Sequence, residues 1–400
     1  MERPLPPQSP QGTQLRPGYL FVLPWYPKSP IGGVNQVLIH LIGLMKAEGN
    51  YEPFLLIPAG NQELPPSPYI ACPIVSMVIR DPVLPTLRAP IAFFLTLPVV
   101  LWRLRAWLVR HRIAAINSHF PSGDSLTYVL LRRLGLFSGK VILSIHGNDI
   151  KDAFATRGFK RFLIRLTLRL ADTVVACSHG LLKDLLRLEP GCARNSVVIH
   201  NAIDAEGFEA KIPPGFVLPG DLRDVPYLLN IGRYEHKKGQ DLLIRAFNRI
   251  APDFPLLRLV MIGGTGPEVE QVRQQVAESP FRERIVMMEN VPHETVPGYL
   301  KASALFVLPS RREGLPFAIL EAAACRRAVV AAACIGVPEL IEDAVTGRLV
   351  PVDDYKALES AIRDLLNDEA ARTRCAQALR DLVDREFTWP TTYRKYLSVS

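Results

Sequence analysis

The chain has 400 residues, of which 22% are charged and 48% hydrophobic, and its formal net charge is +8. This length is enough for two domains with separate cores, and the balanced composition excludes a disordered or fibrous chain. Residues 1–200 hold 22 Lys and Arg against 11 Asp and Glu, so the positive charge belongs to the first half. That half has either an ordinary solvated basic face or an anionic partner, nucleic acid or a phospholipid surface.

Residues 1–17 contain five prolines and no apolar run, so we expect a disordered tail and not a secretory signal. The six cysteines are scattered, without a CxxC pair or a metal-ligand spacing, and predict buried thiols in a reducing, cytoplasmic compartment. The apolar stretch Ala89–Trp102 is 14 residues long and contains Pro98. A spanning helix needs about 20 residues, so no transmembrane helix is predicted.

From residue 18 onward, short apolar runs alternate with longer amphipathic segments. Strands are expected at residues 18–25, 52–58, 114–120, 140–147, 173–178 and 195–201. Continuous apolar strands that alternate with helices are typical of a parallel sheet covered on both faces. Residues 57–85 are rich in proline and lack a clear period, so they are expected to form irregular loops. The sequence predicts a first, acceptor-binding Rossmann-like domain over residues 18–210.

Residues 211–226 are rich in proline and glycine and are predicted to be a linker. The alternation then restarts, with strands expected at residues 227–232, 257–263, 284–289, 305–310, 327–333 and 347–352. This pattern predicts a second Rossmann-like domain over residues 227–384, followed by a helix at 385–400 that packs back on the first domain. Two such domains facing each other place a cleft at the carboxyl ends of both sheets.

Two cations follow the first strand of the second domain. Arg233 and Lys238 lie five residues apart across a strand-to-helix turn. They either converge on one diphosphate, with Arg as a fork and Lys as a point charge, or are exposed basic residues on a loop. The turn GGTGPE, which contains Gly264, allows close backbone approach to a ligand or only satisfies the steric needs of a turn.

The segment from Glu313 to Glu321 carries the densest signal. Glu313, Gly314 and Leu315 follow a strand, and Pro316 is expected at the first position of a helix, where free N–H groups form an anion site. Glu321 lies within an otherwise apolar helix. Burying its carboxylate is costly unless it meets a partner such as a pair of sugar hydroxyls; alternatively, it lies on the exposed stripe of the helix.

Glu313 and Glu321 form a Glu-x7-Glu arrangement, which occurs with the segments GRYEHKKG, GGTGPE and GVPELIEDAVTGRLVP. This ordered set resembles the family 4 retaining glycosyltransferases of the GT-B fold. The resemblance implies an α/β protein in which two Rossmann-like, doubly wound parallel-sheet domains face each other across a cleft. It covers about residues 18–396. The chain departs from the family pattern at two positions. It has Ala202 where the family usually has glycine, and its Glu-x7-Glu segment begins with EGLPF where the family more commonly has an EGFG-type sequence.

The resemblance extends into the first domain through two short segments. Gly32 and Gly33 of IGGVNQ correspond to the family's glycine loop near the donor diphosphate. His146 and Asp149 of HGNDI occupy the family's HGxD segment, although His146 alone would also suit a core histidine. These residues are therefore expected at the donor site, together with Gly264, Gly314, Leu315 and Pro316.

The implied reaction is transfer of a hexose from a UDP- or GDP-sugar to a saccharide or lipid-linked acceptor, in cell-surface polysaccharide or glycolipid assembly. Family members retain the anomeric configuration and need no metal, and this chain has no Asp-x-Asp motif and no expected cofactor. Arg233 and Lys238 would offset the charge of the leaving diphosphate. By resemblance, Glu313 holds donor-sugar hydroxyls, Glu321 the ribose, and His146 the sugar near its reacting carbon.

Other functions fit the two-domain pattern less well. A nucleotide-sugar epimerase is one alternative, and a phosphorylase is disfavoured because no segment indicates a lysine for pyridoxal phosphate. A non-catalytic nucleotide-sugar-binding subunit is a third, but such a chain would be expected to lose some of the site residues that are intact here.

The basic half contains the pattern of an interfacial helix. Residues 159–170 place apolar side chains at helical spacing, with Arg161, Arg165 and Arg169 on another face. Residues 91–112 repeat an apolar and then basic order. We expect either an ordinary amphipathic helix with solvated arginines or peripheral attachment to an anionic membrane, at the cytoplasmic face of the inner membrane. Nucleic acid is disfavoured because no recognised binding motif accompanies the charge.

Overall fold

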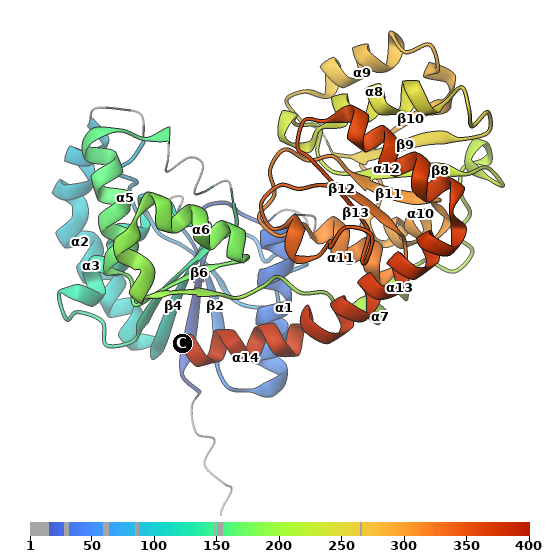
Figure 1. Ribbon diagram of the computed structural model, residues 1–400. Helices are drawn as coiled ribbons and strands as arrows, with labels where there is room; N and C mark the ends of the chain where they lie inside the picture. The colour runs from blue at the N-terminus through green and yellow to red at the C-terminus, as the bar shows by residue number, and fades with distance from the viewer. Residues whose placement is uncertain are drawn as a thin grey trace, which may run out of the picture.

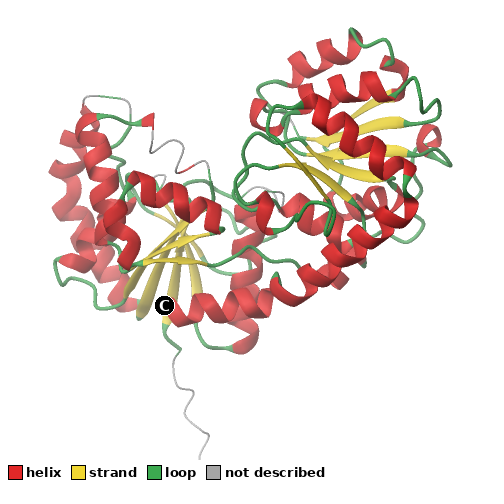
Figure 2. Ribbon diagram, viewed as in Figure 1, coloured by secondary structure: helices red, strands yellow, loops and turns green. Residues whose placement is uncertain are grey.

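The protein is described from a computed structural model, which covers residues 16–27, 32–58, 64–84, 86, 88–147, 149, 155–264 and 266–400. The predicted tail lies outside the described residues except for Arg16 and Pro17. Two parallel sheets, each flanked by helices, form an N-terminal and a C-terminal domain (Figure 1 and Figure 2).

The N-terminal sheet has seven strands in the order β3-β2-β1-β4-β5-β6-β7, and all described pairings are parallel. The strands are β1 (Gly18–Val22), β2 (Glu52–Ile57), β3 (Ile74–Ser76), β4 (Ile113–His119), β5 (Lys140–Ile145), β6 (Thr173–Ala176) and β7 (Ser196–Val198). Every residue of β1 is buried. Helices cover both faces of such a strand, which explains why its sequence is apolar without alternation.

Helices of the N-terminal domain connect these strands. They are α1 (Gly33–Glu48), α2 (Arg88–Arg110), α3 (Ser125–Arg133), α5 (Gly158–Leu170) and α6 (His179–Leu188), followed by the short helices η1 (Pro190–Arg194) and α7 (Ala205–Glu209). The short helix η2 (Gly220–Leu222) lies within the predicted linker, just before the second sheet begins.

The C-terminal sheet has six strands in the order β10-β9-β8-β11-β12-β13, again with parallel pairings. They are β8 (Tyr227–Ile231), β9 (Arg258–Gly263), β10 (Ile285–Glu289), β11 (Leu305–Leu308), β12 (Val329–Ala332) and β13 (Arg348–Val350). In both sheets the strand order reverses beside the first strand, β1 or β8. Ligands of doubly wound sheets bind at the carboxyl ends of the strands at such switch points.

Helices of the C-terminal domain begin with η3 (His236–Lys238), next to the first strand. The others are α8 (Gln240–Ile250), α9 (Val269–Ala277), η4 (Arg282–Arg284), η5 (His293–Thr295), α10 (Val296–Ala302), α11 (Phe317–Ala324), η6 (Val337–Glu339), α12 (Tyr355–Asn367) and α13 (Glu369–Glu386).

The last helix, α14 (Trp389–Val399), returns to the N-terminal domain and lies beside α1 (Figure 1). The Trp389 ring stacks on His40 with a centroid distance of 4.3 Å, and Tyr396 and Tyr393 join the same core cluster. The chain therefore crosses between the domains twice. At the crossing, the N–H of Ile203 donates to the carbonyl of Phe387 at 2.9 Å.

Three local expectations differ from the structure. Residues 57–85 were expected to form irregular loops, but Ile74–Ser76 is a strand that pairs with β2. Three residues are too few to show a hydrophobic period in the sequence. Pro98 lies inside α2 and does not end it, since buried Phe93 and Leu101 hold both halves of the helix against the domain. Helix α11 begins at Phe317, so Pro316 precedes its first residue.

Candidate active site where the two domains meet

The predicted site residues lie on loops that follow strands at or next to the two switch points. Gly32 comes after β1, His146 after β5, Lys238 after β8 and Glu313 after β11. Because parallel strands end at the same edge of each sheet, these four loops gather where the sheets face each other. These four loops form the candidate active site.

His146 forms a hydrogen-bonded pair with His119, which ends β4. The His119 Nδ1 and His146 Nε2 atoms are 3.1 Å apart, and the two rings stack with a centroid distance of 5.3 Å. Burial lowers the pKa of His146 to about 4, and burial together with His146 lowers the pKa of His119 well below its usual range. Both imidazoles are thus neutral near pH 7 and offer hydrogen bonds without charge.

Asp149 holds the backbone of the same loop. Its two carboxylate oxygens accept the N–H groups of His146 at 2.8 Å and Gly147 at 2.7 Å. The sequence assigned Asp149 to donor binding, whereas these contacts give it a supporting role for the position of His146.

Lys238 and Glu313 form an ion pair between the loops after β8 and β11. The Lys238 Nζ atom lies 2.7 Å from Glu313 Oε1, which also accepts the Ser310 hydroxyl at 2.7 Å. The two side chains are only 20% and 11% exposed, so the contact is stronger than an ion pair in open water. A bound diphosphate would compete with Glu313 for this ammonium group.

Arg233 does not join this pair. Its guanidinium is 65% exposed and lies 3.0 Å from Glu235, which also binds Lys237 at 2.8 Å. The predicted convergence of Arg233 and Lys238 on one point is therefore not present among the described side chains. Glu235 holds Arg233 at the surface, and only Lys238 reaches the loop of Glu313.

Backbone contact joins the loops of the two domains. A Cβ atom at Gly314 would overlap the carbonyl of His146, and one at Gly147 would lie 3.4 Å from the Gly314 Cα. The Asn201 side-chain amide donates to the carbonyl of Leu315 at 3.1 Å, and Leu315 itself is buried. The Gly314–Leu315 turn before Pro316 thus lies directly against the loop of His146.

Gly32 and Gly33 bring the start of α1 to the same interface. Gly32 precedes the helix with φ near 113° and has open space around its Cβ position, while the Cβ position of Gly33 is 3.0 Å from the Phe317 ring. The N-cap position of α1 is Gly32, which has no side chain that could cap the first turn. Gly264, after β9, likewise faces open space. Their contact with a donor stays a prediction.

Glu321 is not on an exposed stripe of α11. Its side chain is 12% exposed, and its Oε1 atom lies 3.2 Å from the Nε2 of His293, in the short helix η5. The sequence offered no signal for His293, because nothing in its neighbourhood marks it as a partner of a residue 28 positions away. This bond occupies one carboxylate oxygen and leaves the other for a ligand hydroxyl.

A cavity of about 180 Å³ opens beside Asp149 in the N-terminal domain. Its lining is mostly apolar and includes Phe120, Ser122 and Asp81. The Asp81 carboxylate accepts the N–H groups of Val83 at 2.6 Å and of the residue after Ser122 at 3.3 Å, and burial raises its pKa. Residues 57–85, which contain Asp81, were assigned no function from the sequence.

Two facing parallel-sheet domains with a site at their meeting edges define the GT-B class of glycosyltransferase, and the sequence comparisons agree. Residues 31–206 match the family model described as Glycosyltransferase Family 4, and residues 221–381 match that of Glycosyl transferases group 1. The chain is 26% identical to a GDP-mannose-dependent alpha-(1-6)-phosphatidylinositol monomannoside mannosyltransferase of Mycolicibacterium smegmatis, over 76% of this chain and 80% of that protein. The chain belongs to the family 4-like glycosyltransferases of the GT-B fold.

Solved structures confirm the predicted fold class. Sucrose-phosphate synthase of Thermosynechococcus elongatus aligns with a TM-score of 0.74 at 21% identity, covering 96% of this chain and 98% of the other. Anabaena HepE in complex with UDP aligns with a TM-score of 0.73 at 17% identity, covering 95% and 98%. The chain spans only about three fifths of the length of the related alpha-maltose-1-phosphate synthases.

Replacing Lys238 with alanine is expected to lower kcat/KM for transfer by about 100-fold or more, because a preorganised cation beside the leaving group is lost. Lys237→Ala is the matched control: the Lys237 side chain pairs with Glu235, which keeps Arg233 as a partner. Steady-state kinetics and a thermal unfolding scan of both variants test this. Equal turnover of the two would contradict the role of the Lys238–Glu313 pair.

The buried histidine should make the fold sensitive to acid. The folded-state pKa of His146 is about 4 against an ordinary 6.5, so the folded protein binds fewer protons and loses stability as pH falls through this interval. The expected loss from this group is about 3 kcal/mol. Urea unfolding of the wild type and of His146→Asn, at neutral pH and just above the folded-state pKa, measures it. His236→Gln, at an exposed site, should behave as the wild type, and parallel declines in all three proteins would refute the assignment.

Proposed function

We propose that the protein transfers a hexose from a UDP- or GDP-sugar to a hydroxyl of a saccharide or lipid-linked acceptor, with retention of configuration and without a metal ion. The Lys238–Glu313 pair against the loop of His146 is the observation that carries this proposal. The related mannosyltransferase is GDP-mannose-dependent by name, and the structure of HepE contains UDP. Both nucleotides therefore belong to the proposal.

In the proposed step, the bond between the sugar C1 and the diphosphate oxygen breaks, and a C1–oxygen bond to the acceptor forms on the same face. The acceptor's hydroxyl proton leaves with the nucleoside diphosphate. Lys238 offsets the charge that develops on the departing diphosphate. Glu313, released from Lys238 as the diphosphate binds, accepts hydroxyls of the donor sugar, and neutral His146 holds the sugar near C1.

The cavity beside Asp149 supports an acceptor site in the N-terminal domain. Its apolar walls and the aromatic ring of Phe120 suit a sugar ring face, and Ser122 and Asp81 provide hydrogen-bonding groups at one side. The cavity shares Asp149 with the loop of His146, so an acceptor there would lie next to the donor sugar.

A panel of nucleotide sugars tests the donor and the stereochemistry together. We expect one donor to raise the Tm, because a ligand that binds only the folded state stabilises it. The product formed from that donor should have the same anomeric configuration as the donor sugar, as measured by NMR coupling constants. A chelator should leave the rate of transfer unchanged. An inverted product or a chelator-sensitive rate would overturn these parts of the proposal, and no transfer from any donor would overturn the activity itself.

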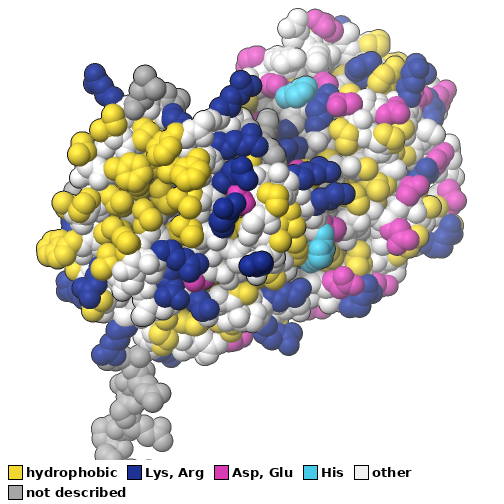
Figure 3. All heavy atoms as spheres, turned by 60° about the vertical axis from the view of Figure 1, so that its left-hand side comes forward, with side chains coloured by type: hydrophobic (Ala, Val, Ile, Leu, Met, Phe, Trp, Pro, Cys, Tyr) yellow, Lys and Arg dark blue, Asp and Glu magenta, His cyan; other side chains and the backbone are white. Residues whose placement is uncertain are grey.

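We further propose that the N-terminal domain docks on an anionic membrane surface, at the cytoplasmic face of the inner membrane. Helix α2 exposes Leu95 at 75%, Trp102 at 71% and Val109 at 64%, and neighbouring α5 exposes Phe159 and Phe162 at more than half. Figure 3 shows a broad hydrophobic area on this domain, bordered by Lys and Arg side chains. An apolar face with a basic border suits an acidic lipid surface.

The cations of this face come mainly from α2. The side chains of Arg165 and Arg169 on α5 lie 2.8 Å from the buried Glu189, so they are not free to bind a lipid phosphate. In contrast, Arg103, Arg105 and Arg110 are exposed and form no ion pair within the part of the chain that the structure describes. Arg165 and Arg169 of the arginine stripe predicted on α5 thus support the fold, whereas Arg161 forms no ion pair among the described residues, and α2 supplies further cations of the basic border.

Length and composition alone would let α2 cross a membrane, in contrast to the expectation from the 14-residue apolar stretch Ala89–Trp102. The helix has 23 residues, and its most apolar window has a mean hydropathy of 1.6 with 22% of residues buried. However, Leu101, Leu104 and Leu108 pack into the main core cluster. Extracting α2 into a bilayer would expose that core, so the proposal is surface docking.

Sedimentation with vesicles tests the docking face. The wild type should bind vesicles containing phosphatidylglycerol more tightly than neutral vesicles, and less tightly at high salt. Leu95→Glu should weaken binding by about tenfold or more, since one large apolar side chain no longer enters the interface. Leu256→Glu, at a site 69% exposed in the C-terminal domain, is the control. Equal binding by both variants, or resistance to alkaline extraction as for a spanning helix, would contradict surface docking.

A further inference from the structure

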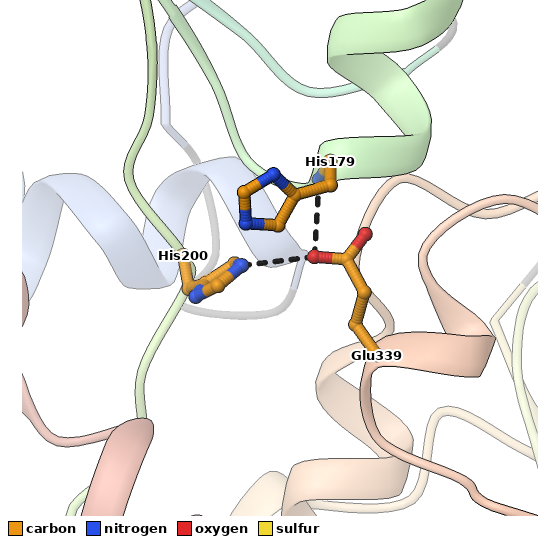
Figure 4. Close-up of side chains that lie close together, drawn as sticks. All are labelled: His179, His200 and Glu339. Carbon is orange, nitrogen blue, oxygen red and sulfur yellow. Dashed lines mark hydrogen bonds and ion pairs between the residues drawn. The ribbon is translucent and has the colours of Figure 1, made fainter.

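A carboxylate from the C-terminal domain is inserted into the N-terminal domain at the start of α6. Glu339 ends the short helix η6, and its side chain reaches the first residues of α6 and the ring of His200 (Figure 4). Its Oε2 atom accepts the His179 N–H at 3.0 Å and lies 2.9 Å from His200 Nε2, while Oε1 accepts the Gly180 N–H at 3.0 Å. One side chain thus makes three hydrogen bonds across the interface.

The partners of Glu339 favour its ionised form. Burial would raise the pKa of this carboxyl, but the hydrogen bonds from His200 and from the backbone N–H groups of Gly180 and His179 outweigh burial and lower it. The N–H groups also lie at the positive end of the α6 dipole. Hydrogen bonds to an ionised group are stronger than neutral ones.

The segment that carries Glu339 also presses on the active-site loop. The Cβ position of Gly180 is 3.2 Å from the Ile335 side chain, so α6 and this segment are in close contact. A Cβ atom at Gly336, whose φ is 77°, would overlap the carbonyl of Gly314. Gly314 in turn contacts the carbonyl of His146. A continuous path of contacts therefore joins Glu339 to the meeting point of Glu313 and His146.

We propose that Glu339 is a positioning residue that holds the two domains in the arrangement required for transfer. Other polar contacts also join the domains: Asn201 donates one neutral hydrogen bond to Leu315, Arg312 lies 3.8 Å from Asp184, and Lys301 pairs with Glu209 of α7. Loss of the Glu339 carboxylate would free the segment that supports Gly314, and Glu313 would lose its fixed position relative to His146. The proposal rests on the proposed function only in treating these two residues as parts of one site.

The same three side chains could instead hold a divalent metal ion, because suitable atoms of His179, His200 and Glu339 lie within 4.8 Å of one another. The hydrogen bonds argue against this use. Both oxygens of Glu339 already accept backbone N–H groups, and a metal on His200 Nε2 would displace its bond to Oε2. The His179 ring has no part in the hydrogen-bonded arrangement, and this difference separates the two interpretations.

The test compares Glu339→Gln with Glu342→Gln, the same change at an exposed acid three residues away. Glu339→Gln should accelerate hydrogen exchange at the His179 and Gly180 amides, increase the radius of gyration in solution scattering, and lower kcat/KM about tenfold or more. Glu342→Gln should match the wild type in all three. The proposal would be overturned if Glu339→Gln stays closed and its His179 and Gly180 amides stay protected. If Glu339→Gln opens but the wild type itself has no transferase activity, only the proposed function would be overturned.

Two further variants separate a hydrogen-bonded latch from a metal clamp. His179→Ala keeps its backbone N–H and should leave closure and amide protection unchanged, while His200→Ala should weaken both. Micromolar Zn²⁺ should not change the Tm of the wild type. A rise in Tm with Zn²⁺ that disappears in His179→Ala would overturn the hydrogen-bonded latch in favour of a metal site.

Discussion

The arrangement of the active site depends on close backbone contact between the two domains. At Gly314, a side chain would overlap the carbonyl of His146, and at Gly336 it would overlap the carbonyl of Gly314. Two loops from one sheet and one loop from the other are thus stacked without side chains between them. Because the stacking leaves no room for adjustment, the position of Glu313 relative to His146 follows from domain closure and not from the flexibility of either side chain.

Each domain contributes a different kind of electrostatics to this contact. The N-terminal domain supplies the buried His119 and the partly buried His146, both neutral near pH 7, and Asp149 supports the loop backbone through hydrogen bonds. The C-terminal domain supplies the Lys238–Glu313 ion pair. A diphospho-sugar has a charged end and a neutral end. Under the proposed function, Lys238 would bind the diphosphate and an uncharged imidazole would bind the sugar, so the polarity of the site would give the donor one direction of binding.

The sequence predicted most strands and the second sheet almost completely, because continuous apolar runs between helices report burial on both faces. It also selected Lys238, Glu313, Gly314 and Glu321, since motif spacing is a local property of the chain. The partners that set the geometry were not predictable in this way. His119, His293 and Glu339 each meet their partner across a separation in sequence that only the packing of helices and loops fixes. Similarly, Arg233 matched the motif but is held outward by Glu235, a competition that spacing alone does not reveal.

The excess of positive charge in residues 1–200 comes from arginines with two different roles. Part of the excess in the first half neutralises buried acids: Arg165 and Arg169 both bind Glu189, whose pKa they lower against the opposing effect of burial. The remaining cations matter where they adjoin exposed apolar side chains, as Arg103, Arg105 and Arg110 do on α2. A soluble protein gains nothing in stability from exposed Leu95 and Trp102 on one helix face. Basic and apolar side chains on the same exposed helix are the combination that the proposed docking on an anionic membrane surface requires.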